Sequence, residues 1–378
     1  MTHTQSADIQ RQDVGAASPD DRALERRLMS WFRTHGSALV GFSGGVDSAY
    51  LACVAVDAIG RDRVLAVIGR SASYPAEQWE RAREVARQFD VPVLEVSTDE
   101  VNDPRYSANP SNRCYFCKTE LWDTLIPLAR ERSLSVIVDG TNADDLADHR
   151  PGARAATEHA VRSPLAELGF SKDAIRRLSR GRGIPTWSQP ASPCLSSRIP
   201  YGTAVTIERL RQVEHAEKAL RAAGITGDLR VRYHGDLARV EIAADTIGDW
   251  LRPRSAATVV AAARSAGFDR VAIDARGFRS GSLNVLGGVV AEPLARATSS
   301  TGEGDPGRLA ETLRSLDIDC EVEGRARLAI MRIADATQVE TLRDDTLRAR
   351  IADMARGQGF THVAIELLNA DDAALCRD

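Results

Sequence analysis

The segment SALVGFSGGVDSAYLACVAV, residues 37–56, decides the fold of this chain. It opens with a short apolar run that is typical of a buried strand, and the residues after Ser48 have the composition of a packed helix. Between them, SGGVDS supplies glycines that let the backbone turn tightly, so several N–H groups point at one spot. The positive end of the helix dipole adds to these donors. The segment therefore predicts a phosphate-binding loop between a strand and a helix.

The polar residues of this loop fit that chemistry. Ser43 and Ser48 bring hydroxyl donors, and Gly44 and Gly45 bring backbone amides. Asp47 brings a carboxylate that can hold Mg²⁺ beside the phosphates. The alternative is an ordinary helix start capped by Asp and Ser. The loop is not a Walker A motif, because no Gly-Lys-Ser/Thr follows the glycines.

The loop resembles the PP-loop of the N-type ATP pyrophosphatases. This resemblance implies that ATP is cleaved between its α and β phosphates, so that a substrate oxygen becomes an adenylate. A nitrogen or sulfur nucleophile then displaces AMP. The loop alone does not distinguish GMP synthetases, NAD synthetases, tRNA thiolation enzymes and sulfur-insertion enzymes.

Composition is that of an ordinary globular protein. The 378 residues suggest two or three domains, and the apolar share of 43% suits ordinary cores. The net charge of -4 gives no general attraction to nucleic acid or to anionic membranes. No apolar run is long enough to span a membrane, and residues 1–20 lack the apolar core of a secretory signal. We therefore expect a disordered tail at 1–20, a cytoplasmic location, and neither a membrane nor a nucleic-acid partner.

After the loop, strand and helix patterns alternate as in a doubly wound parallel α/β sheet. Strand patterns at 64–68, 93–96 and 136–139 are separated by helical patterns at about 75–89 and 118–131. Residues 164–200 are rich in Pro, Ser and Arg, which predicts an active-site loop region between domains. We expect a Rossmann-like PP-loop domain over residues 21–190.

The remainder of the chain contains a repeat. LARVEIA at 237–243 is echoed by LAIMRIA at 328–334, and GFDRVAID at 267–274 is echoed by GFTHVAIE at 359–366. Each copy has a strand–helix–strand pattern, with an extra helix before the first copy, which predicts a small α+β module that is duplicated at the C-terminus. The expected division is a substrate and sulfur-transfer domain over 191–288, a linker over 289–308, and a second copy over 309–378 with decayed function.

Three cysteines carry a further signal. Cys114 and Cys117 form a Cys-x-x-Cys before the helical pattern, and such a pair can chelate a metal or form a redox disulfide. With Cys194 they offer three thiolates, which suits a [4Fe–4S] cluster with one open iron position. The alternative is that Cys114 and Cys117 only pack. Cys53, Cys320 and Cys376 are expected to pack as small apolar residues.

Cys194 also has a possible role of its own. It lies in PCLSSR at 193–198, where Arg198 and the hydroxyls flank it. Because nearby cations favour the thiolate, Cys194 is a candidate nucleophile or sulfur carrier facing an adenylate.

Other polar residues complete the candidate site. The segment 140–145 follows a strand pattern at the edge of the sheet that lines the ligand crevice, and Asn142 is expected at the ATP phosphates. Asp144 and Asp145 in this segment could hold a metal or position a nucleophile; the alternative is an Asx turn with a capped helix. Arg230 and Arg232 alternate on a strand pattern and share one face, where two guanidinium groups can bind a phosphate; the alternative is a solvated edge strand. Glu217 is a weak candidate for Mg²⁺, with surface charge as the alternative.

Together these motifs resemble the LarE family of ATP-dependent sulfur-insertion enzymes. The resemblance covers roughly residues 22–288 and rests on SGGVDS at 43–48, RCYFCK at 113–118, DGTNADD at 139–145, PCLSSRIPYG at 193–202, LRVRYHGDLARVEI at 229–242 and GFRSGSLN at 277–284. It implies adenylation of a carboxylate of pyridinium-3,5-biscarboxylic acid mononucleotide. Sulfur then displaces AMP and leaves a thiocarboxylate, a step in the synthesis of the nickel-pincer nucleotide.

The same resemblance implies roles for single residues. Sulfur comes either from the cysteine matching Cys194, which is left as dehydroalanine, or from a sulfide on a [4Fe–4S] cluster held by three cysteines. The presence of Cys114, Cys117 and Cys194 favours the cluster type. Arg230 and Arg232 would hold the substrate phosphate. The remaining expected contacts, to ATP and Mg²⁺, come from Ser43, Gly44, Gly45, Asp47, Ser48, Asn142 and Arg198. A homo-oligomer is expected, and the tail after about residue 288 departs from the family.

Three other functions stay open at this point. A PP-loop tRNA thiolation enzyme would share the adenylation but should show a basic face or an RNA-binding domain. An amide-forming synthetase would not need three cysteines. A sensor that only binds a nucleotide or an iron–sulfur cluster should have a degraded loop, whereas Asp47 and both serines are present.

Overall fold

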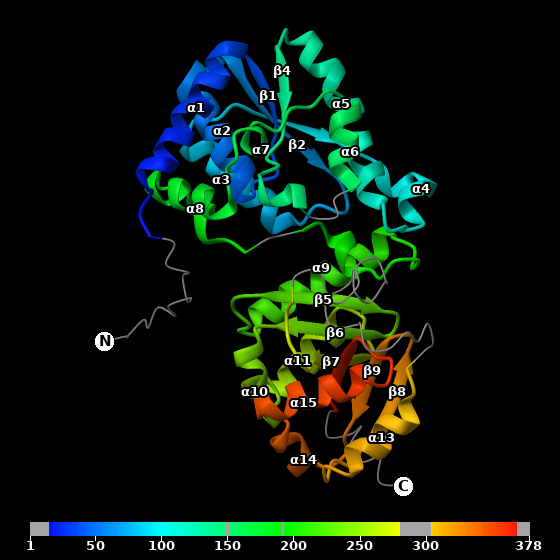
Figure 1. Ribbon diagram of the computed structural model, residues 1–378. Coiled ribbons are helices and arrows are strands. Elements are labelled where there is room, and N and C mark those ends of the chain that lie inside the picture. The colour runs from blue at the N-terminus through cyan, green and yellow to red at the C-terminus, as the bar shows by residue number, and fades with distance from the viewer. Residues whose placement is uncertain (1–14, 148–150, 191–192, 280–303, 369–378) are drawn as a thin grey trace, which may run out of the picture. The chain divides into compact units, whose positions relative to one another are not determined.

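The computed structural model describes residues 15–147, 151–190, 193–279 and 304–368 (Figure 1). The chain divides into two compact units, Met1–Cys194 and Leu195–Asp378. The finer domain limits expected from the sequence stay predictions.

The first unit is built on a four-stranded parallel sheet. Its strands are β1 (Ala38–Gly41), β2 (Val64–Arg70), β3 (Val93–Ser97) and β4 (Val136–Val138), in the order β3-β2-β1-β4. The chain moves outward from β1 to β3 and then crosses back to place β4 on the other side of β1. The direction of winding therefore reverses between β1 and β4, which is where doubly wound sheets bind ligands. The predicted doubly wound sheet is confirmed.

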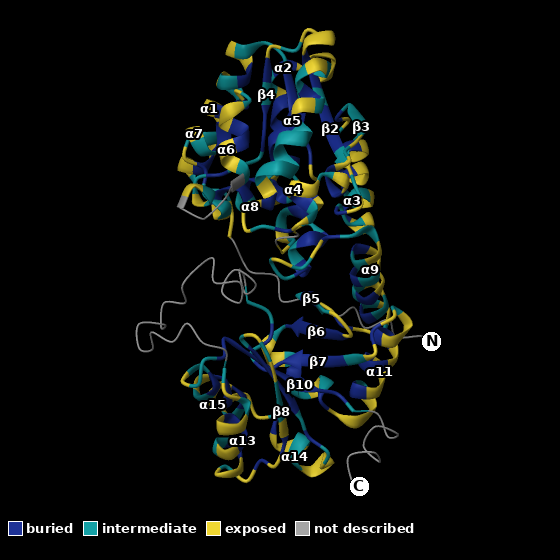
Figure 2. Cartoon of the chain, turned by 90° about the vertical axis from the view of Figure 1, so that its right-hand side faces the viewer, coloured by how far each residue is buried: buried dark blue, intermediate teal, exposed yellow. Residues whose placement is uncertain are grey.

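Helices cover both faces of this sheet. They are α1 (Pro19–His35), α2 (Val46–Ile59), α3 (Ala76–Gln88), α4 (Pro104–Ser107), α5 (Arg113–Glu131), α6 (Pro151–Glu158), α7 (Pro164–Glu167) and α8 (Lys172–Gly181). Ala38 and Val40 of β1 belong to a core shared with α1, α2, α3 and α8. Leu39, between them, belongs to a second core shared with α5 and α6. Because both faces of the sheet are covered, the strands β1, β2 and β4 are mostly apolar and buried, whereas the edge strand β3 is half-buried and contains Glu95 (Figure 2).

Three expectations for the first unit are wrong in part. The expected tail at 1–20 ends early, because Ser18 caps α1 in a capping box with Asp21; residues 1–14 lie outside the described part. The expected loop region at 164–200 contains α8, which Ser171 caps and which buries Ile175 and other apolar side chains. Cys114 and Cys117 lie inside the first turns of α5, not before it, since that helix begins at Arg113.

The second unit is built on a six-stranded sheet in the order β5-β6-β7-β10-β9-β8. Its strands are β5 (Leu229–His234), β6 (Leu237–Ile242), β7 (Arg270–Asp274), β8 (Glu321–Arg325), β9 (Leu328–Arg332) and β10 (His362–Glu366). Its helices are α9 (Ile207–Ala222), α10 (Ile247–Trp250), α11 (Pro253–Ser265), α13 (Pro306–Arg314), α14 (Ala336–Thr341) and α15 (Asp345–Arg356).

The two halves of this sheet have the same topology. In each half an antiparallel hairpin, β5–β6 or β8–β9, is followed by a third strand parallel to the second strand of the hairpin. The third strands, β7 and β10, pair antiparallel and join the halves. The sequence predicted an extra helix before the first half and none before the second. The structure has a helix before each half, α9 before β5 and α13 before β8, so this prediction is wrong for the second half. The α+β modules agree with the sequence, and the duplication itself stays a prediction.

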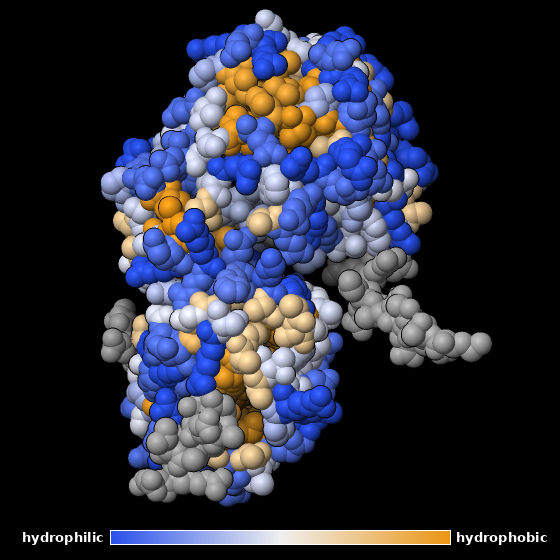
Figure 3. Space-filling model, turned by 180° about the vertical axis from the view of Figure 1, so that it is seen from behind, coloured by the Kyte–Doolittle hydropathy of each residue, from blue (hydrophilic) through white to orange (hydrophobic). Residues whose placement is uncertain are grey.

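The linker expected at 289–308 ends earlier than predicted, because α13 begins at Pro306; residues 280–303 lie outside the described part. Within the described residues, no helix is both long and apolar enough to cross a membrane. The surface seen in Figure 3 is mostly hydrophilic with scattered apolar patches. Leu146 is a large apolar side chain with high exposure, at 67%.

Candidate functional site

The predicted phosphate loop lies between β1 and α2. Gly44 has a φ of +68°, and a Cβ added there would lie 2.6 Å from the Cβ of Ala82 on α3. Both the backbone conformation and the close approach to α3 therefore require glycine. Gly45 is the extended N-cap residue of α2, so the amides of the first helical turn have no earlier carbonyl to bind. The loop presents these amides at the positive end of a buried helix.

Hydrogen bonds within the loop fix its shape. The buried Ser48 hydroxyl donates to the carbonyl of Gly45 at 3.2 Å and accepts from the amide of Ser43 at 3.2 Å. The Ser43 and Ser48 hydroxyls lie 3.1 Å apart. The Ser43 carbonyl accepts from Tyr74 Oη at 2.9 Å and from Gln78 Nε2 at 2.8 Å. The loop is thus held in one shape from both sides.

The segment after β4 meets the start of α2. A Cβ on Gly140 would lie 2.8 Å from the amide nitrogen of Ser48, so the two backbones touch. Asn142 Nδ2 donates to Asp47 Oδ1 at 3.4 Å, and Asn142 Oδ1 accepts from the amides of Asp144 and Asp145 at 3.0 and 3.2 Å. The structure therefore brings Asn142 to the loop, and Asp144 and Asp145 belong to an Asx-type turn.

Lys172 is a loop neighbour that sequence reasoning missed. Its Nζ donates to Asp47 Oδ2 at 2.5 Å, while its amide donates to Asp144 Oδ2 at 2.7 Å. Lys172 is the first residue of α8, where the helix dipole disfavours a cation. A lysine in that position is the signal that could have pointed to an anionic ligand.

The three predicted cysteines lie near one another in the first unit. In the part of the chain that the structure describes, no cysteine is in a disulfide; Cys114 is exposed, and Cys117 and Cys194 are partly buried. Burial holds the pKa of the Cys117 thiol well above its usual range, and negative charge on Glu100, Cys194 and Cys114 raises it further. Cys117 therefore senses charge on both other thiols.

The other cysteines behave as predicted where the structure describes them. Cys53 is buried in α2, and burial raises the pKa of its thiol to about 12. Burial likewise raises the pKa of the Cys320 thiol to about 11. Their packing role is confirmed, and Cys376 lies outside the described residues.

In the second unit, three arginines are buried together. Arg198 is 2% exposed, and Arg230 and Arg232 are each 5% exposed, so the alternative of a solvated edge strand is wrong. The Arg198 guanidinium donates to both carboxylate oxygens of Glu217, at 2.9 and 3.1 Å. Glu217 Oε1 also accepts from the amide of Val231 at 3.0 Å, which anchors the pair to β5.

Arg230 and Arg232 project from β5 on the same face of the sheet. Arg232 binds the carboxylate of Glu241 at 2.7 Å and donates to the carbonyl of Ser197 at 2.9 Å. Arg230 stacks over the ring of Phe278, 5.0 Å from its centroid. Burial lowers the pKa of Arg230 to about 10, and the positive charges of Arg198 and Arg232 lower it further. The three buried guanidinium groups of this cluster therefore outnumber its two carboxylates, those of Glu217 and Glu241. This excess of positive charge favours the binding of an anion.

A second row of charges lies behind this cluster. Arg239, fully buried on β6, contacts Glu241 at 3.0 Å and also binds Asp274 on β7. Glu241, Asp274 and His362 are the one set of potential metal ligands within 4.8 Å of one another among the described residues. Arg239 contacts both carboxylates and Arg232 also binds Glu241, so two guanidinium groups already face these two acidic side chains.

The structure thus sorts the predicted residues into groups. The first unit holds the loop residues Ser43, Gly44, Gly45, Asp47 and Ser48 with Asn142, and the cysteines Cys114, Cys117 and Cys194. The second unit holds Arg198, Arg230 and Arg232 with Glu217. Arg198 lies beside the arginine pair, and its contact with ATP stays a prediction. Glu217 binds Arg198, and its role as a ligand of Mg²⁺ stays a prediction.

Known proteins share these features. The family model described as NAD synthase matches residues 28–111, which contain the loop. The pyridinium-3,5-bisthiocarboxylic acid mononucleotide synthase of Lactiplantibacillus plantarum is 36% identical over 245 residues, which cover 65% of this chain and 88% of that protein. The chain belongs to the LarE family of PP-loop sulfurtransferases.

Two further relatives extend the comparison. An uncharacterized protein of Synechocystis sp. is 44% identical over 257 residues, 68% of this chain and 95% of its own length. An uncharacterized protein of Methanocaldococcus jannaschii is 28% identical over 222 residues, 59% of this chain and 83% of its own length. The LarE family membership predicted from the motifs is confirmed, and with it an enzyme that uses ATP.

Proposed function

We propose that this LarE family member adenylates a carboxylate of pyridinium-3,5-biscarboxylic acid mononucleotide and then exchanges AMP for sulfur. The product is a thiocarboxylate on the route to the nickel-pincer nucleotide. The observation that carries the proposal is the buried cluster of Arg198, Arg230 and Arg232, in a chain that also has the PP-loop. A mononucleotide brings a phosphate monoester with nearly two negative charges at neutral pH.

The electrostatics of the arginine cluster support a phosphate ligand. Burial and repulsion from Arg198 and Arg232 lower the pKa of Arg230 to about 10, so its charged form is less stable here than in water. A phosphate oxygen bound between the guanidinium groups would relieve this repulsion, and arginine can bind two such oxygens at once. Glu217 and Glu241 hold Arg198 and Arg232 from behind, so the cations are oriented before the ligand arrives.

ATP would be bound by the loop of the first unit. Its phosphates would accept hydrogen bonds from the amides at the start of α2 and from Lys172 Nζ. Asp47, which binds Lys172 and Asn142 in the structure, would then hold Mg²⁺ beside those phosphates. A substrate carboxylate oxygen attacks the α-phosphorus, the bond to the β-phosphate oxygen breaks, and pyrophosphate leaves.

Sulfur transfer would use the cysteines. On the sacrificial route, the Cys194 thiolate attacks the carbonyl carbon and expels AMP, giving a thioester. Loss of the Cys194 α-proton then breaks its Cβ–S bond, which leaves the thiocarboxylate and dehydroalanine. On the other route, Cys114, Cys117 and Cys194 would hold a [4Fe–4S] cluster, which supplies a sulfide when bound.

The donor set fits such a cluster. Cys117 lies close enough to Cys114 and Cys194 that negative charge on either raises the pKa of its thiol, and three neighbouring cysteines are what the ligation of such a cluster needs. Burial keeps the Cys117 thiol protonated at neutral pH, so iron binding would have to displace that proton. A cytoplasmic location and a homo-oligomer complete the proposal.

The reaction itself provides the test. The protein, kept anaerobic and reduced, is incubated with ATP and Mg²⁺, with and without the pyridinium mononucleotide, and AMP and pyrophosphate are measured. We expect both products only with the mononucleotide, and Arg232→Ala should raise its KM at least tenfold. Arg61→Ala, which removes an exposed arginine paired with Asp90, is the control and should change neither KM nor kcat. Absence of AMP with the mononucleotide would refute the proposal.

The two sulfur routes are separated by iron content and mass. Anaerobic reconstitution with iron and sulfide should load iron on the native chain and much less on Cys117→Ala. If iron content is the same in both, the cluster route is wrong. Conversion of Cys194 to dehydroalanine after one turnover, seen by peptide mass spectrometry, would identify the sacrificial route.

A further inference from the structure

The two α+β modules of the second unit, which have the same topology, meet in a symmetric seam. Strand β7 pairs antiparallel with β10, and Ile273 lies opposite Ile365. The repeated segments 267–274 and 359–366 put these two isoleucines at equivalent positions. On either side, Ala272 pairs with Glu366 and Asp274 pairs with Ala364, which are again exchanged equivalents. This is the pairing of an isologous homodimer with its axis at the isoleucine pair.

The seam is continued by backbone and apolar contacts. The amide of Ala275 donates to the carbonyl of Val363 at 2.8 Å, and that of Leu367 donates to the carbonyl of Val271 at 2.9 Å. One buried apolar cluster draws on both modules and consists of Leu237, Ala272, Leu328, Ile330 and Ala364. The two modules therefore share a core as well as a sheet.

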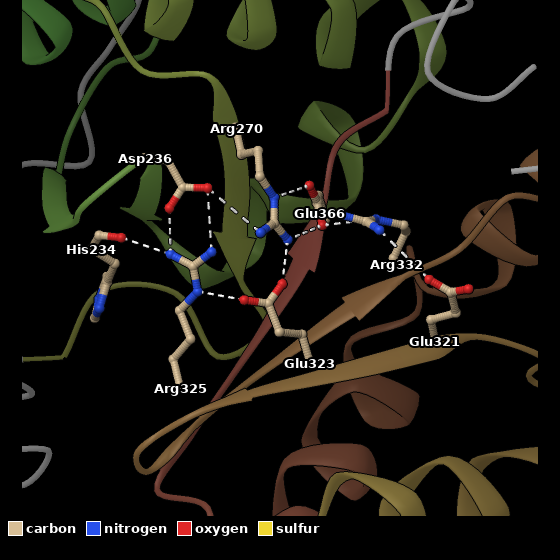
Figure 4. A network of polar contacts seen from close by, with 8 residues as sticks. All are labelled: His234, Asp236, Arg270, Glu321, Glu323, Arg325, Arg332 and Glu366. Atoms are coloured by element: carbon tan, nitrogen blue, oxygen red, sulfur yellow. Dashed lines mark hydrogen bonds and ion pairs between the residues drawn. The ribbon is translucent and has the colours of Figure 1, made fainter. Parts of the chain in front are cut away.

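Ion pairs join the modules at the same place (Figure 4). Arg270 of β7 donates to both carboxylate oxygens of Glu366, each at 2.7 Å, and binds Glu323 at 2.7 Å. Arg325 of β8 binds Asp236 at 2.6 Å, beside β6. Each of these pairs has one member in either module.

The second module lacks the anion site of the first. In the first hairpin Arg230 lies opposite Glu241, and in the second Glu321 lies opposite Arg332, so the charges are exchanged. Glu323 likewise occupies the position of Arg232, opposite Ile330. Two carboxylates in place of two guanidinium groups repel a phosphate, and one of them binds Arg270 instead.

Without the second module, β7 would be an exposed edge strand. An edge presents unpaired amides and carbonyls that readily pair with another chain. The Synechocystis relative is matched over 95% of its length by 257 residues of this chain, so it is too short to contain all of the elements seen here. Such a shorter chain would need another cover for that edge.

We propose that the second module is an internal partner of the first. It occupies, along β7, the place that the same module of a second chain would otherwise take. The chain thus carries a dimer interface within itself, with one anion-binding module and one module that only seals the edge. Any homo-oligomer of the full chain then forms through surfaces other than β7.

Cutting the folded chain tests this. A protease recognition sequence inserted between Ser299 and Ser300 lets the purified full chain be cut, and light scattering gives the mass of the uncut particle as the baseline. We expect the two fragments to stay together at that mass. If they separate at once, the proposal is overturned.

A substitution in the seam tests whether these ion pairs hold the two fragments together. Glu366→Lys places a third cation beside Arg270 and Arg332, so the cut fragments should separate, with an affinity at least tenfold weaker. Asp353→Lys makes the same charge change on α15 at a side chain that is 65% exposed, and its fragments should stay together.

The last test is whether the released N-terminal fragment associates with a second copy of itself. With β7 uncovered, the fragment that ends at Ser299 should pair with itself, and the number of its copies per particle should double. Adding an excess of the unsubstituted fragment from Ser300 onward should convert this pair into a one-to-one complex. Either a fragment that never pairs with itself, or a pair that the added module does not convert, overturns the proposal.

Discussion

Replacing Gly44 by alanine perturbs the phosphate loop where it is most tightly built. The new Cβ would lie 2.6 Å from the Cβ of Ala82 and 2.9 Å from its Cα, and the φ of +68° is unfavourable for alanine. The left-handed backbone costs about 1–2 kcal/mol, and pushing α3 aside adds about 1–3 kcal/mol. We therefore expect the free energy of unfolding of the first unit to fall by about 2–5 kcal/mol. The shifted loop should also release less pyrophosphate from ATP.

Gly183→Ala is the matched control. Gly183 also has a positive φ, +72°, but a Cβ there would meet nothing within 4 Å. Gly183→Ala should lower the free energy of unfolding only by the cost of a left-handed backbone for alanine, about 1–2 kcal/mol, and should leave pyrophosphate release unchanged. Urea unfolding followed by circular dichroism measures the first quantity, and a coupled phosphate assay measures the second. Equal destabilisation by the two substitutions, or full pyrophosphate release by Gly44→Ala, would refute the close approach of the loop to α3.

Three further outcomes follow from buried and exposed groups. Arg239→Met should lower the free energy of unfolding in urea by about 3–5 kcal/mol, because it leaves Asp274 buried without its partner guanidinium and removes one of the two guanidinium groups that bind Glu241; a loss below about 1 kcal/mol, the size expected of a surface ion pair, would contradict this. Desolvation lowers the pKa of the buried His362 and of the half-buried His234 well below 6.5, so only the unfolded chain gains protons at these two imidazoles as the pH falls through that value. The free energy of unfolding should be full above pH 6.5 and should fall on acidification by up to about 1.4 kcal/mol per pH unit for each imidazole, as urea titrations at several pH values would show. Iodoacetamide should alkylate the exposed Cys114 before Cys117, whose thiol stays protonated; faster labelling of Cys117 in peptide mass spectra would contradict its raised pKa.

The fold of the first unit could be predicted from its strands because both faces of the sheet are buried. β1 and β4 are short apolar runs and β2 is apolar up to Arg70, so their positions in the sequence are plain; β3 at the edge of the sheet is half-buried and is interrupted by Glu95. α8 escaped prediction because its three arginines and one lysine give it a polar composition, although Ile175 and Leu178 form a buried face. Composition suggested a loop where periodicity already indicated a helix.

In the second unit, prediction depended on the repeat. The echoes placed β9 and β10, because their buried apolar residues match those of β6 and β7. β8 carries Glu321, Glu323 and Arg325, so neither its composition nor its likeness to β5 marks it as a strand. Its charged side chains are paired with opposite charges elsewhere in the unit: Glu321 with Arg332 on β9, Glu323 with Arg270 on β7, and Arg325 with Asp236. These are tertiary contacts, which the local sequence does not show.

The candidate site shows the same limit. The loop and the arginine pair are local patterns, since strand alternation alone puts Arg230 and Arg232 on one face. What Lys172 does depends on a contact with Asp47, 125 residues away, and no local pattern encodes it. Arg239 is similar, because only the register of β6 against β7 brings it to Asp274.

The exchange of charges between the two hairpins has a consequence for stoichiometry. At the first hairpin, the guanidinium groups of Arg198, Arg230 and Arg232 outnumber the carboxylates of Glu217 and Glu241 that bind two of them. At the second hairpin, Arg332 is bound by the two carboxylates of Glu321 and Glu366, so these pairs carry no excess of positive charge. In each hairpin an arginine lies opposite a glutamate across the two strands, Arg230 opposite Glu241 and Glu321 opposite Arg332. Such a pair of opposite charges stabilises the hairpin whichever strand carries the positive charge. Anion binding needs more than pairing, namely an excess of positive charge in a desolvated place, and only the first hairpin has it. A chain with two modules of one topology should therefore bind one substrate phosphate.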